Sequence, residues 1–331
     1  MLPAQGTFPT QGTAESLSAA TDRSAGPASA AAAPAKRLPW AARFSDYLIL
    51  AKPRIAVMVL LTVALGYGLA ASGRAWNGQL LLTLLGVGLT AVASGALNQW
   101  WERKTDGLMW RTAKRPLPMG RLTALEACLF GLVTGVAGLV ILYTQVNELT
   151  AFLAAMTLLL YTWVYTPLKR LSSLATIIGA IPGAMPPVLG WTGASGELGI
   201  GAVVLFGILF LWQFPHFLAI GWMYREEYEG AGLHMLPAAR GRGGMVGCLA
   251  VVYALALIPV SLQPVTCGLA GGGYAAAALL LGLAYLWASI RFWREESRLK
   301  ARQLLLTSVA YLPLLWLALL LDHWRLASLA G

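Results

Sequence analysis

The sequence predicts an all-α protein whose helices cross a membrane nine times. Its 331 residues are 58% hydrophobic and only 11% charged, whereas a soluble domain carries roughly a quarter charged residues. Uncharged apolar runs recur along the chain, and each is long enough for a bilayer crossing of about 20 residues. These observations exclude a soluble globular enzyme, and they exclude disorder everywhere except at the N-terminus.

The predicted spans are the stretches that contain no charged side chain. One of them, 243–290, is long enough for two helices, and Gln263-Pro264 together with the three glycines at 271–273 supplies the break. Each of the others holds one helix, which brings the total to nine. These single spans are 55–73, 75–101, 127–147, 149–168, 171–196, 198–224 and 303–321.

The N-terminal segment differs in composition from the rest of the chain. Residues 1–43 are rich in Ala, Ser, Thr, Pro and Gly, which predicts a disordered tail in front of a transmembrane domain over 44–325. The segment has no apolar core of the signal-peptide type. Its first arginine, Arg23, follows Glu15 and Asp22, which favours a bacterial cytoplasmic membrane over a mitochondrial inner membrane reached by a transit peptide.

The basic residues predict how the chain is oriented. Nine crossings place the two termini on opposite sides of the membrane. The N-terminal side receives 22 of the 24 Lys and Arg residues, and the other side holds only Arg74 and Arg325. The positive-inside rule therefore places the N-terminus in the cytosol and the C-terminus outside. The net charge of +10 thus reflects topology, and no nucleic-acid partner is expected.

Three oxygen-bearing side chains recur every four residues at the cytosolic end of the second span. Asn98, Glu102 and Asp106 share one helix face because each step of four drifts by only about 40°. Such a stripe offers Mg²⁺ the hard oxygens that it prefers, and nearby cations would neutralise a metal-bound diphosphate. An ordinary charged loop held by salt bridges has the same spacing, so both interpretations stand. The neighbouring cations are Lys104, Arg111, Lys114 and Arg115.

A second cytosolic segment carries Tyr165, Lys169 and Arg170. The two cations suit either a phosphate or anionic lipid head groups, and the tyrosine could add a hydrogen bond to a phosphate. The following span contains three prolines and two glycines within 179–187, which predicts a broken helix. Irregular backbone at membrane depth is tolerated where it lines a cavity or packs against protein, so the break indicates an internal pocket.

A third segment lies at the end of the sixth span. His216 sits within the stretch Trp-Gln-Phe-Pro-His-Phe at 212–217, and it suits either a buried packing residue or a ligand. Glu226 and Glu227 follow the span. They would either hold a second metal ion or pair with the adjacent Arg225.

Taken together, these segments resemble the protohaem IX farnesyltransferase branch of the UbiA superfamily of intramembrane prenyltransferases, over 45–320. The acidic stripe is a pattern of the whole superfamily, whereas the 212–217 stretch is more specific to the haem branch. Glu102 stands where bacterial members usually carry Asp, and 225–228 replaces the spaced aspartates of quinone-type relatives. The other matching segments are 46–47, 52–55, 109–116, 165–170, 181–187 and 235–237.

The resemblance implies nine helices around a central cavity and a transfer of farnesyl from farnesyl diphosphate to a vinyl group of haem b. Water would then add, giving haem O for terminal oxidase biogenesis. Asn98, Glu102 and Asp106 would hold Mg²⁺, with Glu226 and Glu227 for a second ion. Haem A synthase or oxidase assembly factors are the implied protein partners. The implied diphosphate ligands are Lys104, Arg111, Lys114, Arg115, Tyr165, Lys169 and Arg170, and the implied haem contacts are Trp212, Gln213 and His216.

Two other kinds of function remain open from the sequence. The first is another UbiA-type prenyltransferase, which would act on an aromatic or tetrapyrrole acceptor. The second is a membrane protein that transports or handles haem without catalysis. A transporter typically shows paired charges or an inverted repeat near the bilayer midplane, and the sequence shows neither. A haem-handling scaffold would bind haem without consuming a prenyl diphosphate.

Overall fold

The computed structural model describes residues 40–71, 78–234 and 244–330. Most of the predicted tail, together with Arg74 and the 235–237 motif, lies outside these ranges. The first helix already begins at Trp40, ahead of the domain boundary expected after residue 43.

Within these ranges, nine helical segments are long and apolar enough to cross a membrane, as the charge-free runs predict. The predicted break in 243–290 is confirmed, because one helix ends at Thr266 and the next begins at Gly272. Helices and π-helices run in the order α1 Trp40–Ala51, α2 Pro53–Ala70, α3 Gly78–Asp106, α4 Ala124–Ile141, η1 Leu142–Val146, α5 Glu148–Leu159, η2 Leu160–Tyr165, α6 Thr166–Leu168, α7 Leu174–Ala184, α8 Pro186–Ser195, α9 Ile200–Met223, α10 Arg225–Gly230, α11 Met245–Thr266, α12 Gly272–Arg294 and α13 Arg298–Ala330.

Local sequence explains several helix ends. At the start of α4, Thr123 and Glu126 form a reciprocal capping box, which satisfies backbone N–H groups that have no partner within the helix. The side chain of Asn147 accepts from the backbone of Thr150 at 2.8 Å and caps α5. Gly196 ends α8 with a φ of 75°, a conformation that glycine adopts without steric cost.

The fifth span is a broken helix, as its prolines and glycines predict. It divides into α7 and α8, which meet at Met185. Pro186 stands at the start of α8, where its missing N–H would have no intrahelical partner in any case. α7 packs against α9, and α8 packs against α2. The two half-helices therefore contact different neighbours, α9 in one case and α2 in the other.

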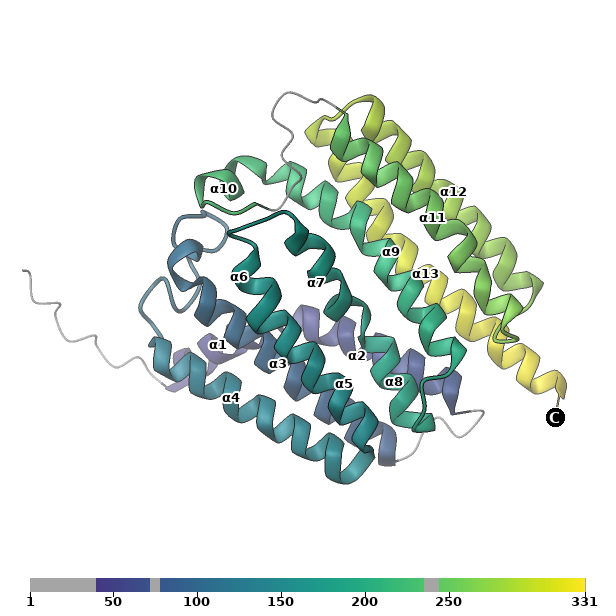
Figure 1. The fold of residues 1–331 in the computed structure, drawn as a ribbon, viewed down its shortest axis with the longest axis horizontal. Helices are drawn as coiled ribbons and strands as arrows, with labels where there is room; N and C mark the ends of the chain where they lie inside the picture. The colour runs from purple at the N-terminus through teal and green to yellow at the C-terminus, as the bar shows by residue number, and fades with distance from the viewer. Residues whose placement is uncertain (1–39, 72–77, 235–243, 331) are drawn as a thin grey trace, which may run out of the picture. The chain divides into compact units, whose positions relative to one another are not determined.

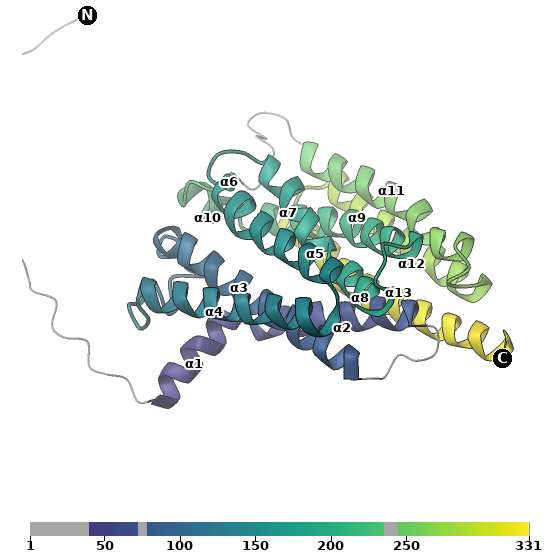
Figure 2. The same ribbon diagram turned by 60° about the horizontal axis from the view of Figure 1, so that its bottom comes forward.

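The helices form two groups on either side of this broken span (Figures 1 and 2). One group consists of α2, α3, α4 and α5, and the other of α9, α11, α12 and α13. The largest cluster of buried apolar side chains fills the second group and includes Leu205, Tyr285 and Leu315. A smaller cluster joins α2, α3, α5 and α8 around Val63 and Leu189.

α2 and α8 approach each other at two glycines. A Cβ on Gly66 would overlap the carbonyl oxygen of Pro187, and a Cβ on Gly190 would overlap that of Val63. The contact therefore joins backbone to backbone, and any larger residue at either glycine would push the helices apart.

A carboxylate from α13 caps the start of α12. Asp322 accepts hydrogen bonds from the backbone N–H of Gly271 at 2.5 Å and of Tyr274 at 3.2 Å. Arg325 pairs with the same carboxylate at 2.7 Å. The last helix of the chain thus supplies the acceptor that α12 needs for its free N–H groups.

Candidate functional site

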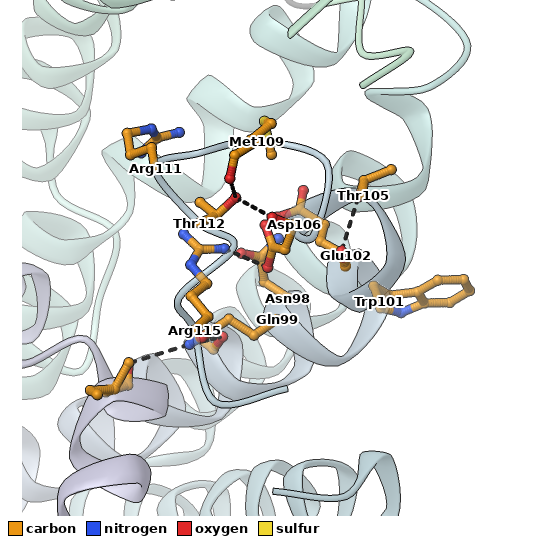
Figure 3. Close-up of polar contacts among 12 residues, drawn as sticks. Asn98, Gln99, Trp101, Glu102, Thr105, Asp106, Met109, Arg111, Thr112 and Arg115 are labelled. Atoms are coloured by element: carbon orange, nitrogen blue, oxygen red, sulfur yellow. Dashed lines mark hydrogen bonds and ion pairs between the residues drawn. The ribbon is translucent and has the colours of Figure 1, made fainter. Parts of the chain in front are cut away.

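Asn98, Glu102 and Asp106 lie on one face at the end of α3 (Figure 3). They are 2%, 8% and 1% exposed, so the stripe is buried and does not form a solvated helix face. Trp101 points away from them. Buried carboxylates of this kind require partners, because desolvation disfavours their charged form.

Each residue of the stripe has its own basic partner, and the partners come from three different parts of the chain. A lysine precedes α2, an arginine lies in the loop after α3, and a second lysine follows α6. These contacts join Lys52 Nζ to Asn98 Oδ1 at 2.8 Å, Arg115 Nη1 to Asp106 Oδ2 at 2.7 Å and Lys169 Nζ to Glu102 Oε1 at 2.8 Å.

Lys52 was not among the predicted site residues. It lies between α1 and α2 with a φ of 49°, and Pro53 follows it. A left-handed conformation is uncommon for a residue with a side chain, and such strain persists where the surroundings enforce it. Burial, aided by the charge of Arg115, lowers the pKa of Lys52 to about 8. The signal in the sequence was the Lys-Pro-Arg segment, which entered only through the family resemblance.

Lys169 is held between an aromatic ring and a carboxylate. Its Nζ lies 4.3 Å from the centre of the Tyr165 ring, within the range of a cation–π contact. Burial opposes the charge on Lys169, but Tyr165 and Glu102 outweigh it and raise the pKa above its usual value. Lys169 therefore stays protonated. In this structure the Tyr165 ring faces the lysine, whereas the sequence predicts that its hydroxyl serves a phosphate.

The loop after α3 is anchored at both ends. The hydroxyl of Thr112 donates to the carbonyl of Asp106 at 2.8 Å. Further along, Arg121 pairs with the buried Asp46 of α1 at 2.9 Å and donates to the carbonyl of Lys114 at 3.1 Å. These contacts fix the loop backbone on both sides of Arg115, so its guanidinium lies beside the stripe.

The segment formed by α10 and the residues after it packs against the loop that follows α3. Met109 packs with Ala231 and Leu233 in a small buried cluster. Arg111 donates to the hydroxyl of Tyr228 at 3.3 Å. Burial raises the pKa of Tyr228, so the hydroxyl remains neutral. The α10 segment, which carries Glu226 and Glu227, therefore lies at the rim of the site.

Two carboxylate oxygens near this rim lack a hydrogen-bond partner. They are Oδ1 of Asp106 and Oε2 of Glu227, and both are buried. Glu226 instead points outward, with its side chain 86% exposed and paired with Arg225 at 3.1 Å. The structure therefore buries one oxygen of Glu227 and leaves Glu226 exposed.

The donor set fits Mg²⁺ only together with a phosphate ligand. In the part of the chain that the structure describes, no three His, Cys, Asp or Glu side chains gather to hold a metal ion. Mg²⁺, however, commonly takes one or two carboxylates and completes its shell with water and substrate phosphates. The free oxygen of Asp106, with Glu102 and the amide of Asn98, matches that pattern.

The remaining predicted diphosphate ligands lie farther from the stripe. Lys104 is exposed, and at two residues from Glu102 it falls on the opposite side of α3. Lys114 and Arg170 are also exposed, and Arg170 donates to the carbonyl of Trp101 at 3.4 Å. The structure therefore brings Lys169 and Arg115 to the stripe, leaves Arg170 and Lys114 at the surface, and turns Lys104 away.

An apolar cavity of about 170 Å³ begins beside the stripe. Lys52 lies in its wall near Gly95, and Val87 lines it eight residues earlier on α3, which is about 12 Å deeper at 1.5 Å per residue. The broken span forms part of the wall, as predicted. The lining residues include Ile55, Val59, Ala154, Leu158, Tyr161, Pro182, Gly183, Pro186 and Leu189.

The predicted haem contacts lie on α9 but face two different neighbours. Gln213 donates to the carbonyl of Ala180 on α7 at 2.8 Å. His216 Nδ1 lies 2.7 Å from Ser308 Oγ on α13, and the Trp212 ring stacks on the histidine with 5.0 Å between centres. Of the three, Gln213 lies nearest the cavity, because a Cβ on the lining residue Gly183 would touch its side-chain oxygen.

Known proteins resemble this chain over most of its length. The model of the UbiA prenyltransferase family matches residues 59–327. A protein named Protoheme IX farnesyltransferase from Solibacter usitatus is 47% identical over 288 residues, covering 84% of this chain and 98% of the relative. A protein of the same name from Koribacter versatilis is 43% identical over 290 residues, covering 84% of this chain and 93% of the relative.

Solved structures share the fold at low sequence identity. A digeranylgeranylglyceryl phosphate synthase superposes with a TM-score of 0.73 at 16% identity, covering 86% of this chain and 99% of that one. A UbiA homolog from Archaeoglobus fulgidus, bound to GPP and Mg²⁺, superposes with a TM-score of 0.59 at 18% identity, covering 83% of this chain and 99% of that one.

Proposed function

Because the chain belongs to the UbiA prenyltransferase family, we propose that it transfers a farnesyl group from farnesyl diphosphate to a vinyl group of haem b. Two relatives named Protoheme IX farnesyltransferase, at 47% and 43% identity, support this choice of substrates. The observation that carries the proposal is a buried stripe of oxygen donors, neutralised by cations, beside an apolar cavity.

The polar end of the site binds the diphosphate. Asn98, Glu102 and Asp106 would hold Mg²⁺, and Glu227 would be the candidate for a second ion. When bound, Mg²⁺ neutralises the phosphate oxygens and makes diphosphate a better leaving group. Arg111 stands at the rim, where its exposed guanidinium meets the incoming substrate.

The cations around the stripe stabilise the charge that develops as the substrate ionises. The bond between farnesyl C1 and the diphosphate oxygen breaks, and its electron pair leaves with diphosphate. Lys52, Arg115 and Lys169 lie beside the metal-binding oxygens, so they face this negative charge. Fixed charges in a site shielded from water stabilise it without reorganisation.

The apolar cavity receives the farnesyl chain. Its wall of helix backbone and apolar side chains keeps water away from the allylic cation until the acceptor arrives. The vinyl π-electrons of haem b then form the new C–C bond. Water adds to the cation left on the porphyrin side chain and loses one proton, which gives haem O. Gln213, Trp212 and His216 are proposed to contact the haem from α9.

The proposed orientation places the stripe on the cytosolic side of a bacterial cytoplasmic membrane. The excess of Lys and Arg in the loops on that side supports it. Haem O would pass from this site to haem A synthase or to an oxidase during its assembly.

The test uses membranes that contain the protein, supplied with haem b, farnesyl diphosphate and Mg²⁺. Glu102→Gln and Asp106→Asn should each lower haem O formation by at least about 100-fold, the loss typical when one stabilising group of a charged transition state is removed. Glu295→Gln serves as the control, because Glu295 lies far along the chain in a loop and makes only a long 3.9 Å pair with Lys300. Normal haem O yields from both stripe variants would refute the proposal.

Offering other acceptors separates the related activities. Labelled farnesyl diphosphate is supplied with haem b, with an aromatic quinone precursor or with a chlorophyll-type tetrapyrrole. Label should enter haem alone. Label in another acceptor would identify a different prenyltransferase, and haem binding without consumption of the diphosphate would identify a haem-handling scaffold.

A further inference from the structure

The π-helix η2 ends in an unusual double hydrogen bond. The backbone N–H of Thr166 donates to the carbonyl oxygen of Tyr161, five residues earlier. The Thr166 hydroxyl donates to the same oxygen at 2.8 Å. Because the single hydroxyl hydrogen is used in this bond, the oxygen of Thr166 is left as an acceptor toward its other neighbours.

That acceptor meets the first residue of the stripe. Asn98 Nδ2 donates to Thr166 Oγ1 at 3.3 Å, while Asn98 Oδ1 accepts from Lys52 Nζ at 2.8 Å. Asn98 and Thr166 are only 2% and 3% exposed, so water does not readily replace either contact. The amide is therefore held from both sides.

A reversed amide would break both contacts. Its NH₂ group would face the ammonium of Lys52, which has donors only. Its oxygen would face a hydroxyl whose hydrogen is committed to Tyr161. A buried donor left without an acceptor costs about 1–3 kcal/mol, so Thr166 and Lys52 together select one orientation of Asn98.

We propose that Thr166 is a positioning residue that keeps the amide oxygen of Asn98 turned toward the metal–diphosphate site. The inference rests on the proposed function, because it assigns a purpose to the orientation of a proposed Mg²⁺ ligand. It also links the two ends of the site, since Tyr161 lines the apolar cavity and Asn98 belongs to the stripe.

The experiment measures the Mg²⁺ concentration needed for binding of inorganic pyrophosphate, by calorimetry on the full-length protein in detergent. Thr166→Val removes the hydroxyl at nearly constant volume and should raise the required Mg²⁺ concentration about 10-fold or more, as the loss of a group that orients a metal ligand typically does. Thr166→Ser keeps the hydroxyl and should bind within about 3-fold of the wild type.

Thr162→Val is the matched control. Thr162 belongs to the same π-helix, is 1% exposed and donates its hydroxyl to the carbonyl of Leu158 at 2.7 Å, but no bond joins it to Asn98. It should leave Mg²⁺ binding unchanged. An equal loss in Thr162→Val and Thr166→Val would mean that the hydroxyls only support η2, and would overturn the proposal.

An Asn98→Asp background gives an independent measurement. A carboxylate presents an oxygen in either orientation, so Thr166→Val should cost less than about 3-fold in Mg²⁺ binding there. An undiminished cost in that background, or wild-type binding by Thr166→Val alone, would overturn the role of Thr166. If the wild-type protein binds no Mg²⁺–pyrophosphate, the proposed function fails first and the inference fails with it.

Discussion

The three contacts between the stripe and its basic partners show how much of a site can be predicted from residue spacing. Asn98, Glu102 and Asp106 lie within one helix, and their four-residue spacing was enough to place them on one face. Their partners come from distant segments. Lys52 precedes Asn98 by 46 residues and Lys169 follows Glu102 by 67. Such pairings depend on how the helices pack, so sequence spacing could not reveal them.

Neighbouring residues with the same side-chain type can also have different environments. Glu226 and Glu227 were predicted together as metal ligands, yet one points outward and the other has a buried, unpartnered oxygen. Adjacent residues on a helix are about 100° apart, so the two side chains leave α10 in different directions.

The pKa of Lys52 predicts how substrate binding depends on pH. Because burial lowers this pKa to about 8, Lys52 is charged at pH 7 and loses its proton as the pH rises through 8. The affinity for farnesyl diphosphate should then fall about 10-fold, the usual worth of a hydrogen bond to a charged group.

Lys52→Arg provides the comparison, because a guanidinium stays protonated up to about pH 12. Binding of a non-hydrolysable farnesyl diphosphate analogue is measured from pH 6.5 to 9.5. The fall above pH 8 should disappear in the variant. The same fall in both proteins would assign the titration to another group.

At the scale of secondary structure, the sequence predicted the breaks between helices better than the helix type, α or π. The prolines within 179–187 located the break between α7 and α8, and Pro264 with the glycines at 271–273 located the end of α11. The π-helices η1 and η2 leave no comparable signal in residue type. Their wider turns depend on packing and on side-chain contacts such as that of Thr166 with Tyr161.

The contact between α2 and α8 predicts that one glycine is essential and its neighbour is not. Gly66→Ala would place a methyl group against the carbonyl of Pro187 and should destabilise the protein by about 1–3 kcal/mol or more. Gly68→Ala is the control in the same helix, because a Cβ there meets nothing within 4 Å. Thermal unfolding in detergent should show a lower Tm for the first variant only. Equal Tm values would mean that the two helices separate easily.

At the scale of the whole molecule, composition and charge predicted the number of spans, and the described residues contain nine candidate spans. The way these helices form two groups around a broken span was not readable from hydropathy, because each span is apolar on most faces. The apolar cavity likewise depends on residues from four spans. In the sequence, only the proline-rich break within 179–187 indicated a cavity.

The orientation can be tested with alkaline phosphatase fusions, since this enzyme is active only outside the cytosol. A fusion after Arg325 should be active, and a fusion after Gly120, in the loop between α3 and α4, should be inactive. The reason is the excess of Lys and Arg on the side of that loop. The reverse pattern of activity would invert the proposed topology.

The size of the apolar cavity should set the length of the accepted isoprenoid. Ala154 is 1% exposed and lines the cavity, so Ala154→Leu would fill part of it. The ratio of kcat/KM for geranyl over farnesyl diphosphate should then rise about 10-fold or more, the usual effect of added methylenes in an apolar pocket. Phe152→Leu is the control, because Phe152 is 60% exposed on the surface of α5. An unchanged ratio in Ala154→Leu would place the chain elsewhere.

The carboxylate of Asp322 has a consequence for the order in which the protein can mature during synthesis. The ribosome makes Gly271 51 residues before the acceptor that will satisfy its N–H group. Until the last helix is translated, the start of α12 has no protein partner for that group and relies on water or lipid head groups. The start of α12 therefore cannot gain this cap until the segment that carries Asp322 has been made and has packed beside it.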